Sequence, residues 1–139
     1  MIILIEKRAI DSALVASQNI HPKEFISLFT GSFDKETETY TLEDLIIAPL
    51  SQSDFHSSSF NPYLLPVAME TIATFHSHPS GVPIPSLQDL AFFAKNQPIH
   101  LIAGFPYVHQ TTKAYDRNGK EIEIKIIKNK TLQKNQLEI

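Results

Sequence analysis

The sequence predicts a single α/β (α+β) domain, in which one β-sheet is flanked by helices. Three observations predict this class. The chain has 139 residues, of which 42% are hydrophobic and 19% charged, as expected for one ordinary globular domain. Short runs with strand character are separated by two segments of helical periodicity. No internal repeat or low-complexity linker divides the chain, so we assign residues 1–139 to one domain.

The first half of the chain predicts a strand, a helix and a hairpin. Residues 2–5, IILI, form a short apolar run that is typical of a buried strand. Apolar residues at helical spacing predict a helix over 6–18. His21-Pro22 ends this segment, because the residue before a proline is disfavoured in the helical conformation. Two strands rich in aromatic and branched residues then form the expected hairpin, over 25–31 and 37–50.

The second half predicts a strand and a helix on either side of a proline-rich bend, at 69–77 and 86–96. One face of this helix would be apolar, formed by Leu87, Leu90, Phe93 and Ala94. The remaining strands are expected at 99–104, 113–116 and 121–127. The last two form a pair joined by the turn signal Asn118-Gly119.

Residues 51–66 are rich in Ser, punctuated by Pro and without periodicity, and they predict a flexible insertion loop. Such loops often carry function. His56 lies in this loop, where it is a candidate for a contact with substrate.

Composition and charge exclude several classes of protein. With no cysteine, a metal site must use His, Asp or Glu. The apolar start MIILI is too short for a signal peptide or a membrane span, so we expect a cytoplasmic protein without a membrane partner. The net charge is −3, and the basic excess after residue 112 is mixed with acidic residues and poor in aromatics. We therefore expect no nucleic-acid partner.

The stretch FHSHPSGVPIPSLQD, residues 75–89, contains the strongest chemical signal. His76 and His78 are two apart, so in a strand both imidazoles project from the same face. Two imidazoles and one further ligand would make a catalytic zinc site that leaves a fourth position for water. Asp89, in the first turn of the next helix, is the candidate third ligand. Alternatively, Ser86 and Asp89 form a simple helix cap.

The spacing His-x-His, seven residues, Ser, two residues, Asp resembles the signature of the JAMM metallopeptidases, the MPN or JAB-type domain. Upstream, residues 22–31, PKEFISLFTG, are similar to the family's segment with a catalytic glutamate before an apolar strand. The resemblance runs from about residue 22 to residue 89, and Tyr115 fits the family's usual finish. It implies a cytidine-deaminase-like fold with a curved mixed sheet flanked by helices, as in a small stand-alone prokaryotic member.

The resemblance also implies roles for individual residues. One Zn²⁺ per chain would be held by His76, His78 and Asp89. Glu24 would be the general base and then the acid that protonates the leaving amine. Ser86 would hydrogen-bond the oxyanion or the bound water. Glu70 is the alternative base, whereas the remaining histidines outside the loop are expected to be structural or exposed: His21, His100 and His109.

The implied reaction is hydrolysis of the bond between the C-terminal Gly-Gly of a ubiquitin-like modifier and a lysine or other amine. The expected partners are therefore conjugates of ubiquitin-like or sulfur-carrier proteins with Gly-Gly tails, which the loop 51–66 would help to hold. One alternative is a peptidase that processes the C-terminus of a sulfur carrier. The other is a non-catalytic MPN scaffold, against which the complete residue set argues. The oligomeric state has no signal in the sequence.

Overall fold

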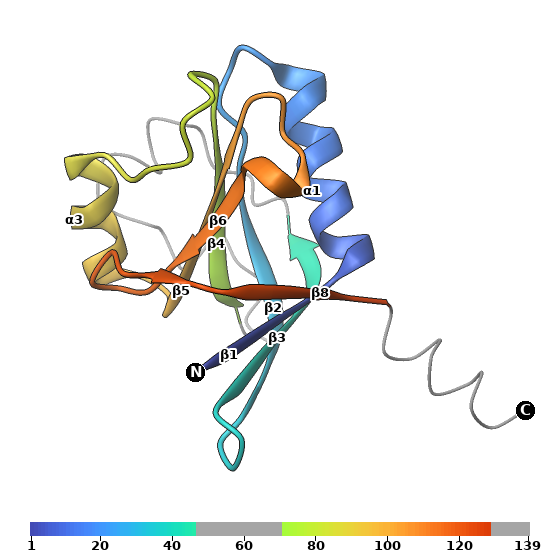
Figure 1. Ribbon diagram of the computed structural model, residues 1–139, viewed down its shortest axis with the longest axis vertical. Coiled ribbons are helices and arrows are strands. Elements are labelled where there is room, and N and C mark those ends of the chain that lie inside the picture. The colour runs from blue at the N-terminus through green and yellow to red at the C-terminus, as the bar shows by residue number, and fades with distance from the viewer. Residues whose placement is uncertain (47–70, 129–139) are drawn as a thin grey trace, which may run out of the picture.

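The computed structural model describes residues 1–46 and 71–128 (Figure 1). The predicted loop 51–66 lies outside these ranges. The elements in chain order are β1 (Ile2–Glu6), α1 (Lys7–Ile20), β2 (Ile26–Asp34), β3 (Thr39–Ile46), β4 (Thr71–His78), α3 (Leu87–Lys95), β5 (Ile99–Gly104), the 3₁₀ turn η2 (His109–Thr111), β6 (Thr112–Tyr115), β7 (Glu121–Ile122) and β8 (Ile124–Ile127). The predicted fold class, one mixed sheet with helices, is confirmed. Within the described ranges no helix has the length and apolar character needed to cross a membrane.

The strands form one mixed sheet in the order β7-β6-β5-β4-β2-β3-β1-β8. β4 pairs in parallel with β5 and antiparallel with β2. The C-terminal ends of β4 and β5 therefore lie at the same end of the sheet as the N-terminal end of β2. The β2–β3 hairpin lies at the opposite end, at the bottom of Figure 1. This arrangement brings residues 21–26, 76–81 and 104–107 to one end of the sheet.

Helices α1 and α3 cover opposite faces of the sheet (Figure 1). Successive strand residues point to opposite faces, and β5 shows the result. Leu101 belongs to the main core, which includes Ala13 of α1, whereas Ile102 packs with Phe93 of α3 and with Tyr115. Each helix is thus held by burying apolar side chains against its own face of the sheet.

The prediction of one strand over 121–127 is wrong. Residues Glu121–Ile122 pair antiparallel with β6, as predicted, but Ile124–Ile127 pair in parallel with β1 at the other edge of the sheet. The ladder breaks at residue 123, and the chain passes from one outer strand to the other. Because these two edge strands are consecutive in the chain, the sheet must curve until its edges approach each other.

The apolar face predicted for α3 is rotated by about one residue. Asp89 and Phe93 are the buried residues of this helix, whereas Leu87 is 86% exposed and Ala94 is exposed. The cause lies at the start of the helix, where hydrogen bonds with Ser86 turn the Asp89 side chain toward the sheet. That orientation fixes which residues of the following turns face inward.

Candidate metal centre

The two histidines lie at the C-terminal end of β4, as the sequence predicts, and their side chains project from the same face. Their Nε2 atoms are 3.0 Å apart. His76 is buried, with its ring centroid 6.4 Å from that of Phe93, and His78 is partly exposed. The strand therefore presents one enclosed and one more accessible imidazole to the same point.

The carboxylate of Asp89 reaches the same point from the first turn of α3. Its Oδ1 lies 3.3 Å from His76 Nε2, and its Oδ2 lies 3.2 Å from His78 Nε2. The helix cap weighed from the sequence is also present. Ser86 Oγ accepts the Asp89 N–H at 3.0 Å, and Asp89 Oδ2 accepts the Ser86 N–H at 2.9 Å. Cap and ligand group are therefore not alternatives, since the cap orients the carboxylate toward the histidines.

The electrostatics of the group are those of a negative charge held among imidazoles. Burial opposes ionisation of Asp89, but hydrogen bonds from His76 and His78 outweigh it, so its pKa lies far below the usual range. Burial opposes the protonation of His78. The hydrogen bonds of His78 to Asp89 and to the Val82 carbonyl, together with the charges of Asp89 and Glu24, nevertheless raise its pKa. The arrangement thus favours a cation at this point.

The donor set fits a divalent metal ion. The three candidate ligand atoms, from His76, His78 and Asp89, lie within 4.8 Å of one another. His78 Nδ1 lies 2.9 Å from the Val82 carbonyl, which can only accept, so Nδ1 carries the proton and Nε2 keeps its lone pair. In metal sites, the ring nitrogen that does not bind the metal commonly donates such a hydrogen bond, which fixes the orientation of the imidazole. Two imidazoles and one carboxylate match a zinc site with three protein ligands.

Glu24 lies immediately before β2, and β2 pairs with β4. The register places Ile26 opposite His76, and Phe25 is bonded to Ser77. Continued by one more residue, this register places Glu24 opposite His78, and opposed residues of an antiparallel pair point to the same face. The effect of the Glu24 charge on the pKa of His78 agrees with this placement. A glutamate 54 positions before His78 is thereby brought beside the candidate ligands.

Ser77 belongs to the family signature, where a role in backbone shape is expected, but its partner could not be predicted from the sequence. Its hydroxyl accepts the N–H of Phe25 at 2.8 Å, and its own N–H donates to the Phe25 carbonyl at 3.0 Å. Ser77, which separates the two histidines, thus fastens β4 to the residue that follows Glu24. The expected role in backbone shape agrees with these two bonds, whereas the partner, Phe25, is 52 positions away and has no signal in the sequence.

Tyr115 contributes to the bend between the histidines and α3. Its hydroxyl donates to the Pro83 carbonyl at 2.5 Å, and its ring stacks on Phe93 at a centroid distance of 6.1 Å. The bend is therefore anchored to β6, on the far side of β5. This contact gives a structural reason for a tyrosine at the position that the family resemblance singled out.

The other predicted residues are distributed as follows. Glu70 and His56 lie outside the described ranges. His100 is buried and structural: it stacks on Phe93 at 4.1 Å and bonds to Thr74. His21 and His109 have partners of their own, Tyr107 and Asp11.

Comparison with known proteins gives a consistent picture. The family model described as prokaryotic homologs of the JAB domain matches residues 6–118. A protein of Haloferax volcanii named "Probable metalloprotease" is 32% identical over 123 residues, which cover 86% of this chain and 76% of the relative.

Among solved structures, a JAB1/MPN domain protein from Archaeoglobus fulgidus matches with a TM-score of 0.69 and 31% identity, over 89% of this chain and 98% of that one. A structure described as JAMM, a metalloprotease-like zinc site in the proteasome and signalosome, matches with a TM-score of 0.67 and 29% identity, over 92% of this chain and 100% of that one. The chain therefore belongs to the prokaryotic JAB-domain family, and its His76–His78–Asp89 group is the candidate metal site of a JAMM-type metalloprotease.

Proposed function

We propose that this protein is a zinc-dependent isopeptidase that hydrolyses the bond between the C-terminal Gly-Gly of a ubiquitin-like modifier and a lysine or other amine. One observation carries the hydrolytic part of the proposal. A carboxylate, Glu24, lies opposite His78 in the strand register, beside a three-ligand group formed by His76, His78 and Asp89. A carboxylate next to a group of metal ligands can take a proton from water that the metal activates.

In this proposal His76, His78 and Asp89 hold one Zn²⁺, which supplies Lewis-acid polarisation of a carbonyl and lowers the pKa of a water molecule. Glu24 accepts a proton from the attacking water and later gives it to the leaving amine. The water oxygen becomes bonded to the carbonyl carbon, the C–N bond breaks, and the products are a carboxylate and a free amine. The side chain of Glu24 is half-buried, so it is open to a substrate.

Ser86 has a hydroxyl proton to donate in this scheme. Its oxygen accepts the Asp89 N–H in the helix cap, and a hydroxyl can accept and donate at once. Ser86 is exposed at the start of α3, next to the ligand Asp89. We assign it the stabilisation of negative charge on the carbonyl oxygen during hydrolysis.

The substrate class rests on the family. The matched JAMM structure is described as a site in the proteasome and signalosome, which supports a protein conjugate as substrate. We assign the binding of the Gly-Gly tail to the loop 51–66, which lies outside the described residues.

The first test is the metal content of the purified protein. We expect about one zinc per chain, lost on His76→Ala. The matched control is His109→Gln, which alters a histidine paired with Asp11 on α1 and should keep the metal. Protein that holds no zinc, or equal zinc in all three forms, would contradict the site.

The second test separates the possible substrates. The zinc-loaded protein is incubated with a ubiquitin-like protein joined to lysine through its Gly-Gly tail, and with a sulfur carrier extended at its C-terminus. Cleavage of the conjugate supports the isopeptidase. Cleavage of the extension alone would favour a processing peptidase, and zinc-loaded protein that cleaves neither would favour the scaffold.

A further inference from the structure

The segment Phe105–His109, which follows β5, contacts both halves of the candidate site. At its start, the Phe105 N–H donates to the carbonyl of the candidate ligand His78 at 3.1 Å. At its centre, the Tyr107 hydroxyl lies 2.6 Å from Nδ1 of His21, three residues before Glu24. One short piece of chain is therefore bonded to the strand end that carries the ligands and to the turn that carries the candidate base.

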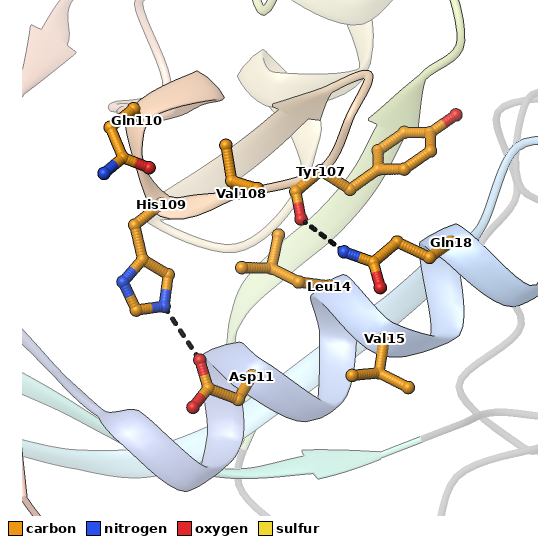
Figure 2. Close-up of a pocket in the computed structure, with 8 residues that line it drawn as sticks. All are labelled: Asp11, Leu14, Val15, Gln18, Tyr107, Val108, His109 and Gln110. Carbon is orange, nitrogen blue, oxygen red and sulfur yellow. Dashed lines mark hydrogen bonds and ion pairs between the residues drawn. The ribbon is translucent and has the colours of Figure 1, made fainter.

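The backbone of this segment is held firmly by α1. A shallow hollow of about 400 Å³ lies between α1 and the segment, and Figure 2 shows the residues that line it. Across it, Gln18 Nε2 donates to the Tyr107 carbonyl at 3.1 Å, and His109 Nε2 lies 2.8 Å from Asp11 Oδ1. The Tyr107 N–H also donates to the Gly104 carbonyl at 2.8 Å. These bonds fix the segment at both ends and in the middle.

Tyr107 adopts a costly conformation within this frame. Its φ is +62°, in the left-handed region that a bulky residue rarely adopts, and such conformations persist where the surroundings fix them. Its side chain is 1% exposed and extends away from the other side chains of the hollow (Figure 2). The conformation thus directs a buried phenol toward the turn at His21.

In the chain, Glu24 lies between His21 and Phe25, and both of these residues are held by contacts with other segments. On one side, the His21 ring packs on Phe105 at a centroid distance of 4.7 Å and bonds to the Tyr107 hydroxyl. On the other side, Phe25 is bonded to Ser77 of β4. Burial, followed by the charge of Glu24, raises the pKa of Tyr107, which places the carboxylate within electrostatic range of the phenol.

We propose that Tyr107 is a positioning residue for Glu24. The Tyr107 hydroxyl fixes the turn 21–24 through its hydrogen bond with His21. The segment Phe105–His109, which contains Tyr107, is also bonded to the His78 carbonyl. This segment therefore sets the distance between the Glu24 carboxylate and the metal group. The inference rests on the base role proposed for Glu24. Precise spacing matters because a displacement of about 1 Å in an active site can cost about 100-fold in rate.

Tyr107→Phe is the decisive variant, since it removes the hydroxyl and keeps the ring. On the conjugate that the wild type cleaves, we expect kcat to fall about tenfold, with KM and zinc content unchanged. Tyr40→Phe, the same substitution in β3 near the hairpin at the opposite end of the sheet, should leave kcat unchanged. Wild-type kcat in Tyr107→Phe, or a loss of zinc that accounts for the whole effect, would overturn the proposal.

A second pair of variants tests the link from the side of the turn and covers the case in which Tyr107→Phe does not fold. His21→Ala removes the partner of the phenol, whereas His21→Asn places an amide near the position of Nδ1. We expect His21→Ala to lower kcat as Tyr107→Phe does, and His21→Asn to keep most of the activity. Equal losses in both would show that the hydrogen bond is not what positions Glu24.

A readout independent of activity separates this inference from the proposed function. The amide protons of Lys23 and Glu24 should exchange about fivefold faster in Tyr107→Phe than in the wild type, and at the wild-type rate in Tyr40→Phe. If the wild type cleaves nothing, the proposed function fails while the exchange data still test the anchor. Unchanged exchange in Tyr107→Phe would overturn the anchor, whatever the activity.

Discussion

Ser86 and Asp89 hold each other in a reciprocal hydrogen-bonded pair, with N–H to side-chain distances of 3.0 and 2.9 Å. The same Asp89 carboxylate lies within 3.3 Å of the Nε2 atoms of both histidines. One side chain thus begins a helix and completes a candidate metal group. The geometry of the metal group is therefore tied to the stability of the first turn of α3.

Asp89→Asn tests the role of Asp89 as a metal ligand separately from its role in the helix cap. The amide oxygen of asparagine can still accept the Ser86 N–H, so the cap is largely kept while the negative charge is lost. We expect zinc affinity to fall at least about tenfold, and the metal-free protein to lose stability at neutral pH as well, because the carboxylate charge that His76 and His78 stabilise is gone. Zinc titration and urea unfolding in chelator measure the two effects.

Ser86→Ala tests the opposite half of the pair. It leaves the charge on Asp89 but removes the acceptor of the Asp89 N–H, so the metal-free protein should lose about 1 kcal/mol of stability. Hydrolysis should fall further than zinc affinity, because the hydroxyl is also proposed to stabilise negative charge on the substrate. Equal stability of Ser86→Ala and wild type would show that the cap contributes little.

Glu24→Gln should keep zinc and lose hydrolysis by about 10²–10⁴-fold, because the amide cannot accept the proton of water. The matched control is Glu36→Gln in the exposed turn between β2 and β3, at the opposite end of the sheet, which should act as wild type. Full activity in Glu24→Gln would move the base to another carboxylate, with Glu70 next in line.

His100 should make the stability of the metal-free protein depend on pH. Burial is the main cause that lowers its pKa from 6.5 to about 4, so between these values the unfolded chain binds more protons than the folded one. The contribution is fully present above pH 6.5 and is lost as the pH falls toward 4, by on the order of 3 kcal/mol in total. Urea unfolding at pH 7 and pH 5, with chelator present, should show a larger loss for wild type than for His100→Gln.

Gly104→Ala should destabilise the end of the sheet that carries the site. A Cβ at this position would lie 2.6 Å from the Gly81 carbonyl oxygen and 2.7 Å from its carbon, and these backbone atoms have little freedom to move. We expect a loss of about 1–3 kcal/mol and weaker zinc binding, because Gly81 is bonded to the His78 carbonyl. Thermal unfolding and zinc titration check both effects, and an unchanged melting temperature would contradict the close approach.

Local patterns in the sequence predicted much of the fold. The strand that carries His76 and His78, the helix start at Ser86 and the strand Ile99–Gly104 all have clear local signals in periodicity, capping residues or branched side chains. The path of Ile124–Ile127 to β1 has none. A strand four residues long carries no information about which edge of a sheet it will join.

The same division holds for the candidate site. The spacing of His76, His78 and Asp89 predicted a group that the structure brings together, because strand and helix geometry fix where such side chains project. The Val82 carbonyl and the pair of Tyr107 with His21 depend on tertiary contacts between distant segments. No local pattern encodes these contacts, so only the structure reveals them.

The β2–β3 hairpin lies at the end of the sheet opposite the candidate site (Figure 1). Its turn residues, 35–38, are all exposed. Exposed turns of this kind tolerate added chain, because an insertion there displaces no packed side chain. An affinity handle or a fused reporter domain placed between Asp34 and Thr39 would leave access to the candidate metal centre open, which makes this turn the natural attachment point for capturing substrates on a surface.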